Sequence, residues 1–305
     1  LVGSEMCIRD RVMIGLVGTV VAIKEIGHAP PSVATIVVAL LVAAIGFWLF
    51  VRRQRRLENP LLEFSIFLNP AFSAGVLAAA FAMFAIGGIQ LVTTQRFQQV
   101  VGFSPLEAGL LVAVIAVGSL PTALLGGAFL HRVGLLALIT GGLAVATGGV
   151  VVTVVGFQSS FGVLVLGLLV TGAGLGAAMS VASTAIIGNV PVRRAGMAAS
   201  LEEVSYEFGS LIAVSVLGSL LTAIYTASVV LPNGAPAAAG DGIAEALEAA
   251  QGDAAIIQAA STAFDSAYLV VMLVVAGVLA AAAVITGVLL RRYLPGTQSQ
   301  LHSEH

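Results

Sequence analysis

Charge and cysteine are scarce in this chain. Only 9% of its 305 residues are charged, and it has one cysteine, Cys7, and four histidines. A single cysteine excludes an internal disulfide and a multi-cysteine metal site, and the scattered histidines lack zinc-ligand spacing. The net charge of −2 points to no nucleic-acid partner. No nucleophile constellation can be found, so we expect no metal, no cofactor, no nucleic acid and no enzymatic activity.

Apolar sequence is what the chain has in abundance. Hydrophobic residues make up 59% of it, and the mean hydropathy is +1.07. A soluble domain with this balance would expose one large apolar patch. Long apolar runs, without the alternation of barrel strands, favour helices that span a membrane. The sequence therefore predicts an all-α, polytopic membrane protein embedded in a lipid bilayer.

Eight apolar segments have lengths that suit, or nearly suit, membrane spans. They cover residues 12–25, 32–51, 70–93, 106–130, 134–156, 161–188, 197–225 and 267–290. The first segment looks clipped. Pro121, with Gly126 and Gly127 after it, predicts a kink in the fourth segment. The glycine-rich fifth and sixth segments predict helices that approach one another closely.

Basic residues are concentrated in the loops after the second, fourth and sixth segments. In the loops on the other side, only two basic residues are found, Lys24 and Arg96. The favoured loops and the region after the last segment contain Arg52, Arg53, Arg55, Arg56, Arg132, Arg193, Arg194, Arg291 and Arg292. The positive-inside rule then predicts that the C-terminus faces the cytoplasm.

Three carboxylates interrupt the seventh segment, at Glu202, Glu203 and Glu207. Each costs roughly 2.5–3.5 kcal/mol to insert into a membrane, so three on one helix suggest a function. Helical geometry puts Glu203 and Glu207 on one face, about 6 Å apart along the axis, with Tyr206 beside them and Glu202 about a quarter turn away. A neutral carboxyl can carry a proton and an ionised one attracts a cation, while Tyr206 offers an aromatic face to an organic cation.

We therefore predict a site for protons and substrate at Glu203, Glu207, Glu202 and Tyr206. Two alternatives stay open. Glu202 and Glu203 could lie in the headgroup region and face water. Gln90, in the third segment, is a further candidate for the site: it could line a cavity or bond to a neighbouring helix.

Several strings carry a family resemblance. They are GAGLGAAMS (172–180), STAIIGNVPVRRAGMAASLEEVSYEFGS (183–210), NPAFSAG (69–75), QRFQQVVGFSPLEAG (95–109) and FLHRVG (129–134). Together they resemble the fourteen-span drug:proton antiporters of the major facilitator superfamily, of the quaternary-ammonium and multidrug efflux type, over about residues 12 to 294. The pair of adjacent glutamates followed by a third is their most specific part.

The resemblance implies a C-terminal fragment of such an antiporter. It implies export of small cationic amphiphilic compounds across the bacterial inner membrane, with protons as the coupling ion. Glu202, Glu203 and Glu207 would take part in substrate recognition or proton coupling. The partner would be the missing N-terminal six-helix half, without which the fragment would not transport. A proton-coupled exporter of a neutral or anionic metabolite is the main alternative, and an intramembrane enzyme is a remote one.

The resemblance also implies a domain organisation. Residues 1–11 look like a non-native, adaptor-like leader. Residues 12–60 hold two extra linker spans, the first clipped, and a basic cytoplasmic loop. Residues 61–294 hold the six-helix C-terminal bundle, and residues 295–305 form a cytoplasmic tail. Within the bundle, the periplasmic loop 226–265 could contain a short amphipathic helix or be a flexible loop.

Overall fold

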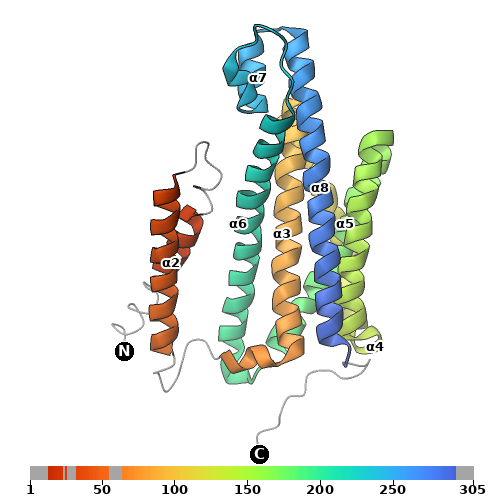
Figure 1. Ribbon diagram of the computed structural model, residues 1–305. Coiled ribbons are helices and arrows are strands. Elements are labelled where there is room, and N and C mark those ends of the chain that lie inside the picture. Colours follow the sequence, from red (N-terminus) through yellow and green to blue (C-terminus); the bar gives the residue numbers. More distant parts are fainter. Residues whose placement is uncertain (1–12, 23–24, 26–31, 55–63, 293–305) are drawn as a thin grey trace, which may run out of the picture. The chain divides into compact units, whose positions relative to one another are not determined.

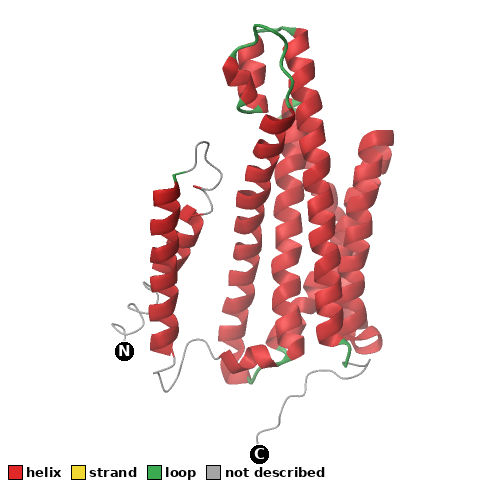
Figure 2. Cartoon of the chain, in the orientation of Figure 1, coloured by secondary structure: helices red, strands yellow, loops and turns green. Residues whose placement is uncertain are grey.

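The computed structural model describes residues 13–22, 25, 32–54 and 64–292. These residues form helices joined by turns and loops, with no strand among them (Figure 2). This confirms the predicted all-α fold. The chain divides into two compact units, residues 1–65 and 66–305. The predicted leader, the predicted tail and the predicted boundary after residue 60 lie outside the described residues.

The first unit contains a short apolar helix, Met13–Ala22, and α2, Val33–Gln54. A side-chain carbon on Gly18 would lie 2.7 Å from the backbone nitrogen of Ala43, so these two helices pack backbone to backbone. Near the end of α2, the Arg52 guanidinium lies 5.1 Å from the centre of the Trp48 ring. Tryptophan and arginine are typical of the boundary between lipid and water, so α2 has the character of a membrane span.

The described part of the second unit has five long helices and four short ones. The long ones are α3 (Pro70–Gln99), α4 (Pro105–Ser159), α5 (Phe161–Ile187), α6 (Ala195–Ser228) and α8 (Ala254–Leu290). The short ones are η1 (Phe64–Leu68), η2 (Val192–Arg194), η3 (Ala237–Gly240) and α7 (Ile243–Ala250). η1 begins two residues before the unit does. In Figure 1, α3 runs between α6 and α8 and packs against both. Each long helix is apolar enough to cross a membrane.

Local sequence fixes where these helices begin. Asn69 precedes Pro70, and its side-chain oxygen accepts a hydrogen bond from the Ala71 amide at 2.9 Å. Ser104 and Glu107 form a reciprocal capping box at the start of α4. Asp253 accepts from the Ala255 amide at 2.9 Å and starts α8. Such caps satisfy backbone amides that a helix leaves without partners.

α4 is a hairpin of two spans. Gly134 interrupts it with φ 84° and ψ 163°, a conformation that is essentially restricted to glycine. Ile115 before the break meets Gly172 of α5, and Gly149 after the break meets the adjacent Thr171. Both halves of α4 therefore run along α5. The two halves correspond to the predicted fourth and fifth segments, 106–130 and 134–156. The non-helical residue is Gly134 rather than the predicted Pro121, which lies inside continuous helix.

Glycine brings the helices close together, as predicted. A side-chain carbon on Gly142 of α4 would lie 2.7 Å from the carbonyl oxygen of Gly174 on α5. On α6, the same atom on Gly209 would collide with the carbonyl oxygen of Ala80 on α3. These contacts leave no room for a methyl group, so the spacing of the helices depends on glycine at these positions.

The segment between α6 and α8 is folded. The Tyr225 hydroxyl donates a hydrogen bond to the Ala239 carbonyl at 2.9 Å, and α7 buries Ile243 and two alanines. The amphipathic-helix alternative is thus confirmed for α7. α8 contains the predicted last span, 267–290, and begins earlier, at residue 254, where Asp253 caps it. α3 likewise contains the predicted third segment and continues past it to residue 99, so that Arg96 is part of the helix.

Candidate functional site

Glu202 is the buried carboxylate of α6. It lies seven residues into the helix, about 10 Å along its axis, and only 7% of it is exposed. The Tyr206 hydroxyl donates a hydrogen bond to Oε1 of Glu202 at 2.7 Å. The Ser183 hydroxyl of α5 donates to Oε2 at 3.2 Å. Both carboxylate oxygens therefore have a donor; the Tyr206 bond lies within α6, and the Ser183 bond joins α5 to α6.

This arrangement corrects the alternative in which Glu202 faces water. α5 packs against this turn of α6, so the side chain is buried and meets Ser183. Sequence reasoning missed Ser183. A serine in an apolar span gives no sign of which neighbouring helix it faces, and this one lies 19 positions from its partner.

Glu203 and Glu207 lie on the exposed side of α6. Their shared face agrees with the helical spacing. Glu207 is twelve residues from the start of the helix, about 18 Å along the axis. The structure therefore brings Glu202 and Tyr206 together and leaves the other two carboxylates open on a different face.

Gln90 is exposed on α3. One turn earlier, a side-chain carbon on Gly87 would lie 3.3 Å from the Ser210 hydroxyl, so this part of α3 adjoins the middle of α6. The predicted alternative of a bond from Gln90 to another helix has no counterpart among the described residues. The next residue of α3, Leu91, lies 3.6 Å from the position of a side-chain carbon on Gly218, so Gln90 is level with a part of α6 well beyond Glu207.

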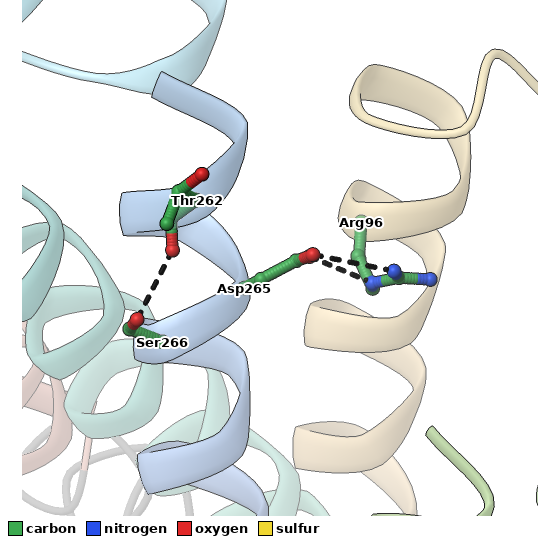
Figure 3. Close-up of polar contacts among 4 residues, drawn as sticks. All are labelled: Arg96, Thr262, Asp265 and Ser266. Carbon is green, nitrogen blue, oxygen red and sulfur yellow. Dashed lines mark hydrogen bonds and ion pairs between the residues drawn. The ribbon is translucent and has the colours of Figure 1, made fainter. Parts of the chain in front are cut away.

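An ion pair that sequence reasoning missed joins α3 to α8. The Arg96 guanidinium donates from Nε to Oδ1 of Asp265 at 2.9 Å and from Nη2 to Oδ2 at 3.5 Å (Figure 3). The guanidinium carbon lies 4.3 Å from the centre of the Phe157 ring and 4.9 Å from that of Phe97. Arg96 and Asp265 were both predicted to lie in loops outside the membrane. Charged residues are common in loops, so opposite charge alone does not show which of them form a pair.

Residues 75–240, more than half of the chain, match the family model described as the Major Facilitator Superfamily. The chain belongs to the Major Facilitator Superfamily. This confirms the resemblance seen in the sequence. Members of the superfamily are membrane transporters, so the chain belongs to a family of membrane-embedded transporters and the enzyme alternative is wrong.

Relatives within the superfamily are named for drug resistance. The multidrug efflux pump LfrA of Mycolicibacterium smegmatis is 28% identical over 89% of this chain and 56% of its own length. The multidrug resistance protein Stp of Mycobacterium tuberculosis is 31% identical over 70% of this chain and 39% of its own length. The methyl viologen resistance protein SmvA of Salmonella typhimurium is 29% identical over 68% of this chain and 42% of its own length. The chain thus spans about half the length of these relatives.

A solved structure shares the fold. A bacterial homologue of the human lysosomal transporter Spinster, in its inward-facing and occupied conformation, superposes with a TM-score of 0.61. The match is 18% identical and covers 87% of this chain and 59% of that structure. It supports a major facilitator fold for the chain.

Proposed function

We propose that this chain forms the C-terminal part of an exporter that exchanges small cationic amphiphilic compounds for protons. The names of the relatives support efflux of drugs. Methyl viologen, in the name of SmvA, is an organic dication, the class of compound that carboxylates and aromatic rings bind. No cofactor is needed, since the proton gradient supplies the driving force.

The observation that carries the proposal is the buried Glu202. An ionised carboxylate only accepts hydrogen bonds, whereas a protonated one also donates, and hydroxyls can do both. Tyr206 and Ser183 can therefore stay bonded to Glu202 in either protonation state. A carboxyl inside the helix bundle that can change its charge and keep its partners suits proton coupling.

Glu203 and Glu207 have the complementary role. Their exposure on another face of α6 leaves their charge available to a cationic compound. We assign proton coupling to Glu202 and recognition of the cation to Glu203 and Glu207. Tyr206 lies beside Glu202 and Glu203, and Gln90 would line the same cavity further along α3. Protons from outside neutralise carboxyls on α6, the cation is released outward, and the protons leave to the cytoplasm.

Transport also needs a second wall for the cavity. In major facilitator transporters two helical halves rock about a site near the middle of the membrane. The exposed carboxylates of α6 would face the N-terminal six-helix half of the same protein. The chain alone is therefore expected not to transport.

The distribution of arginines supports one orientation of the chain in the membrane. In the second unit, α4 turns at Gly134 at the end of the bundle where α5 ends and α6 begins, and α8 ends there too (Figure 1). This end carries Arg132, Arg193, Arg194, Arg291 and Arg292. Arg96 is at the other end of α3. By the positive-inside rule the arginine-rich end, with the C-terminus, faces the cytoplasm of a bacterial inner membrane.

The test is dye efflux from loaded cells that express the full open reading frame encoding this chain. We expect Glu202→Gln to abolish efflux of monovalent and divalent cations alike, because the coupling proton is lost. We expect Glu203→Gln and Glu207→Gln to reduce efflux of divalent dyes more than that of monovalent ones. Ser200→Ala, at an exposed position on the same helix, is the control and should leave efflux intact. Unchanged efflux in all three glutamine variants would exclude the site.

A further inference from the structure

A small apolar cluster, separate from the main core, lies at the end of the bundle where α3 and α6 begin. Its buried members come from η1, α3, α5, α6 and the turn after α5, and they are Ile66, Phe72, Ala79, Ile186, Val190 and Ala198. Ile66 anchors η1, and Val190 anchors the turn that leads into η2. The Ser73 hydroxyl donates a hydrogen bond to the Phe67 carbonyl at 2.6 Å, which ties η1 to the first turn of α3. Both short helices therefore have fixed places at this end of the bundle, and η1 runs across the foot of α3 (Figure 1).

Each of the two short helices presents a large apolar side chain on its outer side. Leu68 of η1 and Val192 of η2 are both 84% exposed. Val230, just after α6 at the opposite end of the bundle, is exposed to the same degree, at 83%. The hydrophobic effect favours the transfer of such side chains out of water, so the surroundings of each end decide whether they find an apolar medium.

Positive charge accompanies Leu68 and Val192 but not Val230. Arg193 directly follows Val192, is exposed, and has no ion-pair partner among the described residues. Residues 64–73 and 188–200 contain no acidic residue, whereas residues 229–253, around Val230, contain four acidic residues and no basic one. The surface formed by η1 and η2 thus combines apolar side chains with an available cation, which complements an anionic amphiphile.

The depth of this surface suits lipid headgroups. The partly exposed Arg96–Asp265 pair, with the Arg96 guanidinium against aromatic rings, has the character of one membrane boundary. Pro70 lies 26 positions before Arg96 on α3, which is about 39 Å along the helix axis. A bilayer is about 30 Å thick in its hydrocarbon core and about 40–45 Å thick with its headgroups. With the ion pair at one boundary, η1 and η2 lie at the headgroups of the other leaflet.

We propose that η1 and η2 form a docking surface for the anionic phospholipids of that leaflet. Leu68 and Val192 insert at the boundary between headgroups and acyl chains, as the apolar side of an interfacial helix does. The Arg193 guanidinium binds lipid phosphate, because its planar fork of donors matches phosphate oxygens. The proposal depends neither on the transport activity nor on which side of the membrane this end faces.

The test is tryptophan fluorescence of the purified 305-residue chain in lipid nanodiscs. Trp48→Phe removes the only tryptophan, and Leu68→Trp or Val192→Trp then introduces a single reporter at an exposed position. Phospholipids that carry bromine near the headgroup end of their acyl chains quench tryptophan on contact. We expect several-fold stronger quenching of both reporters than of Val230→Trp, the equally exposed control at the other end. Quenching of either reporter at or below the level of Val230→Trp would overturn the proposal.

Two lipid mixtures test the preference for anionic lipid. Each contains equal parts of phosphatidylglycerol and phosphatidylcholine, and only one of the two lipids carries bromine. We expect quenching of both reporters to be about twofold or more stronger when phosphatidylglycerol carries the bromine, because arginine near a membrane surface attracts anionic lipid. Arg193→Gln should reduce this difference, and Arg193→Lys, which keeps the charge, should retain most of it. Equal quenching in the two mixtures would exclude anionic lipid as the partner, and a difference that is unchanged in Arg193→Gln would exclude Arg193 as its ligand.

Discussion

At the scale of single residues, polar groups inside this bundle depend on partners from other helices. Glu202 meets Ser183 of α5, and Arg96 of α3 meets Asp265 of α8. The sequence was enough to single out the carboxylates of α6, because charge is rare in a span. It could not identify Ser183 as the partner of Glu202, or pair Arg96 with Asp265. The members of these two pairs are 19 and 169 positions apart, and their contact depends on how the helices pack.

The bond between Tyr206 and Glu202 should contribute measurably to stability. We expect Tyr206→Phe to lower the free energy of unfolding by about 1–3 kcal/mol, because the buried carboxylate loses a donor. The measurement is denaturation of the purified chain in detergent. In a Glu202→Met background the same substitution should cost much less, since the two changes remove one shared bond. Equal costs in both backgrounds would show that the bond does not form.

At the scale of helices, the sequence predicted the number of spans better than their ends. Apolar runs revealed each long helix, and glycine-rich segments marked close packing. The ends depend on capping by single residues, such as Asp253, which starts α8 far before the apolar run. The turn at Gly134 lies where the sequence separated the fourth and fifth segments, whereas the kink expected at Pro121 is replaced by continuous helix.

Close packing of α6 on α3 gives a prediction with an internal control. We expect Gly209→Ala to lower the free energy of unfolding by about 1–3 kcal/mol, because the new methyl collides with the Ala80 carbonyl. Gly218→Ala, on the same helix, would place its methyl 3.6 Å from Leu91, an ordinary contact. That variant should be neutral or slightly stabilising in the same denaturation measurement. A similar cost for both would argue against backbone contact between α6 and α3 at Gly209.

At the scale of the whole molecule, composition alone identified a helical membrane protein, and the strings around the glutamates identified the superfamily. Residues 75–240 carry the match to the superfamily. In the described part of the second unit, short connections and the turn at Gly134 link successive spans, except between α6 and α8, where residues 229–253 intervene. The division between Glu202 and the exposed carboxylates could not be predicted, because it depends on where α5 packs.

The proposed orientation can be tested by accessibility. In a Cys7→Ser background, Asn233→Cys places a thiol in the exposed segment between α6 and α7, and Arg292→Cys places one after α8. We expect a membrane-impermeant maleimide to label the first in intact cells and the second only after lysis, because arginines are retained on the cytoplasmic side. The reverse pattern would invert the topology.

The length of α8 has a practical consequence. Its 37 residues extend about 55 Å, whereas the hydrocarbon layer is about 30 Å thick. One end therefore stands clear of lipid, and α7 and η3 are folded against one another beside it. Small transporters offer electron microscopy few features outside the detergent micelle. An antibody fragment raised against η3, α7 and the start of α8 would bind a folded epitope outside the micelle. The bound fragment would make the particle asymmetric, which helps to align the images.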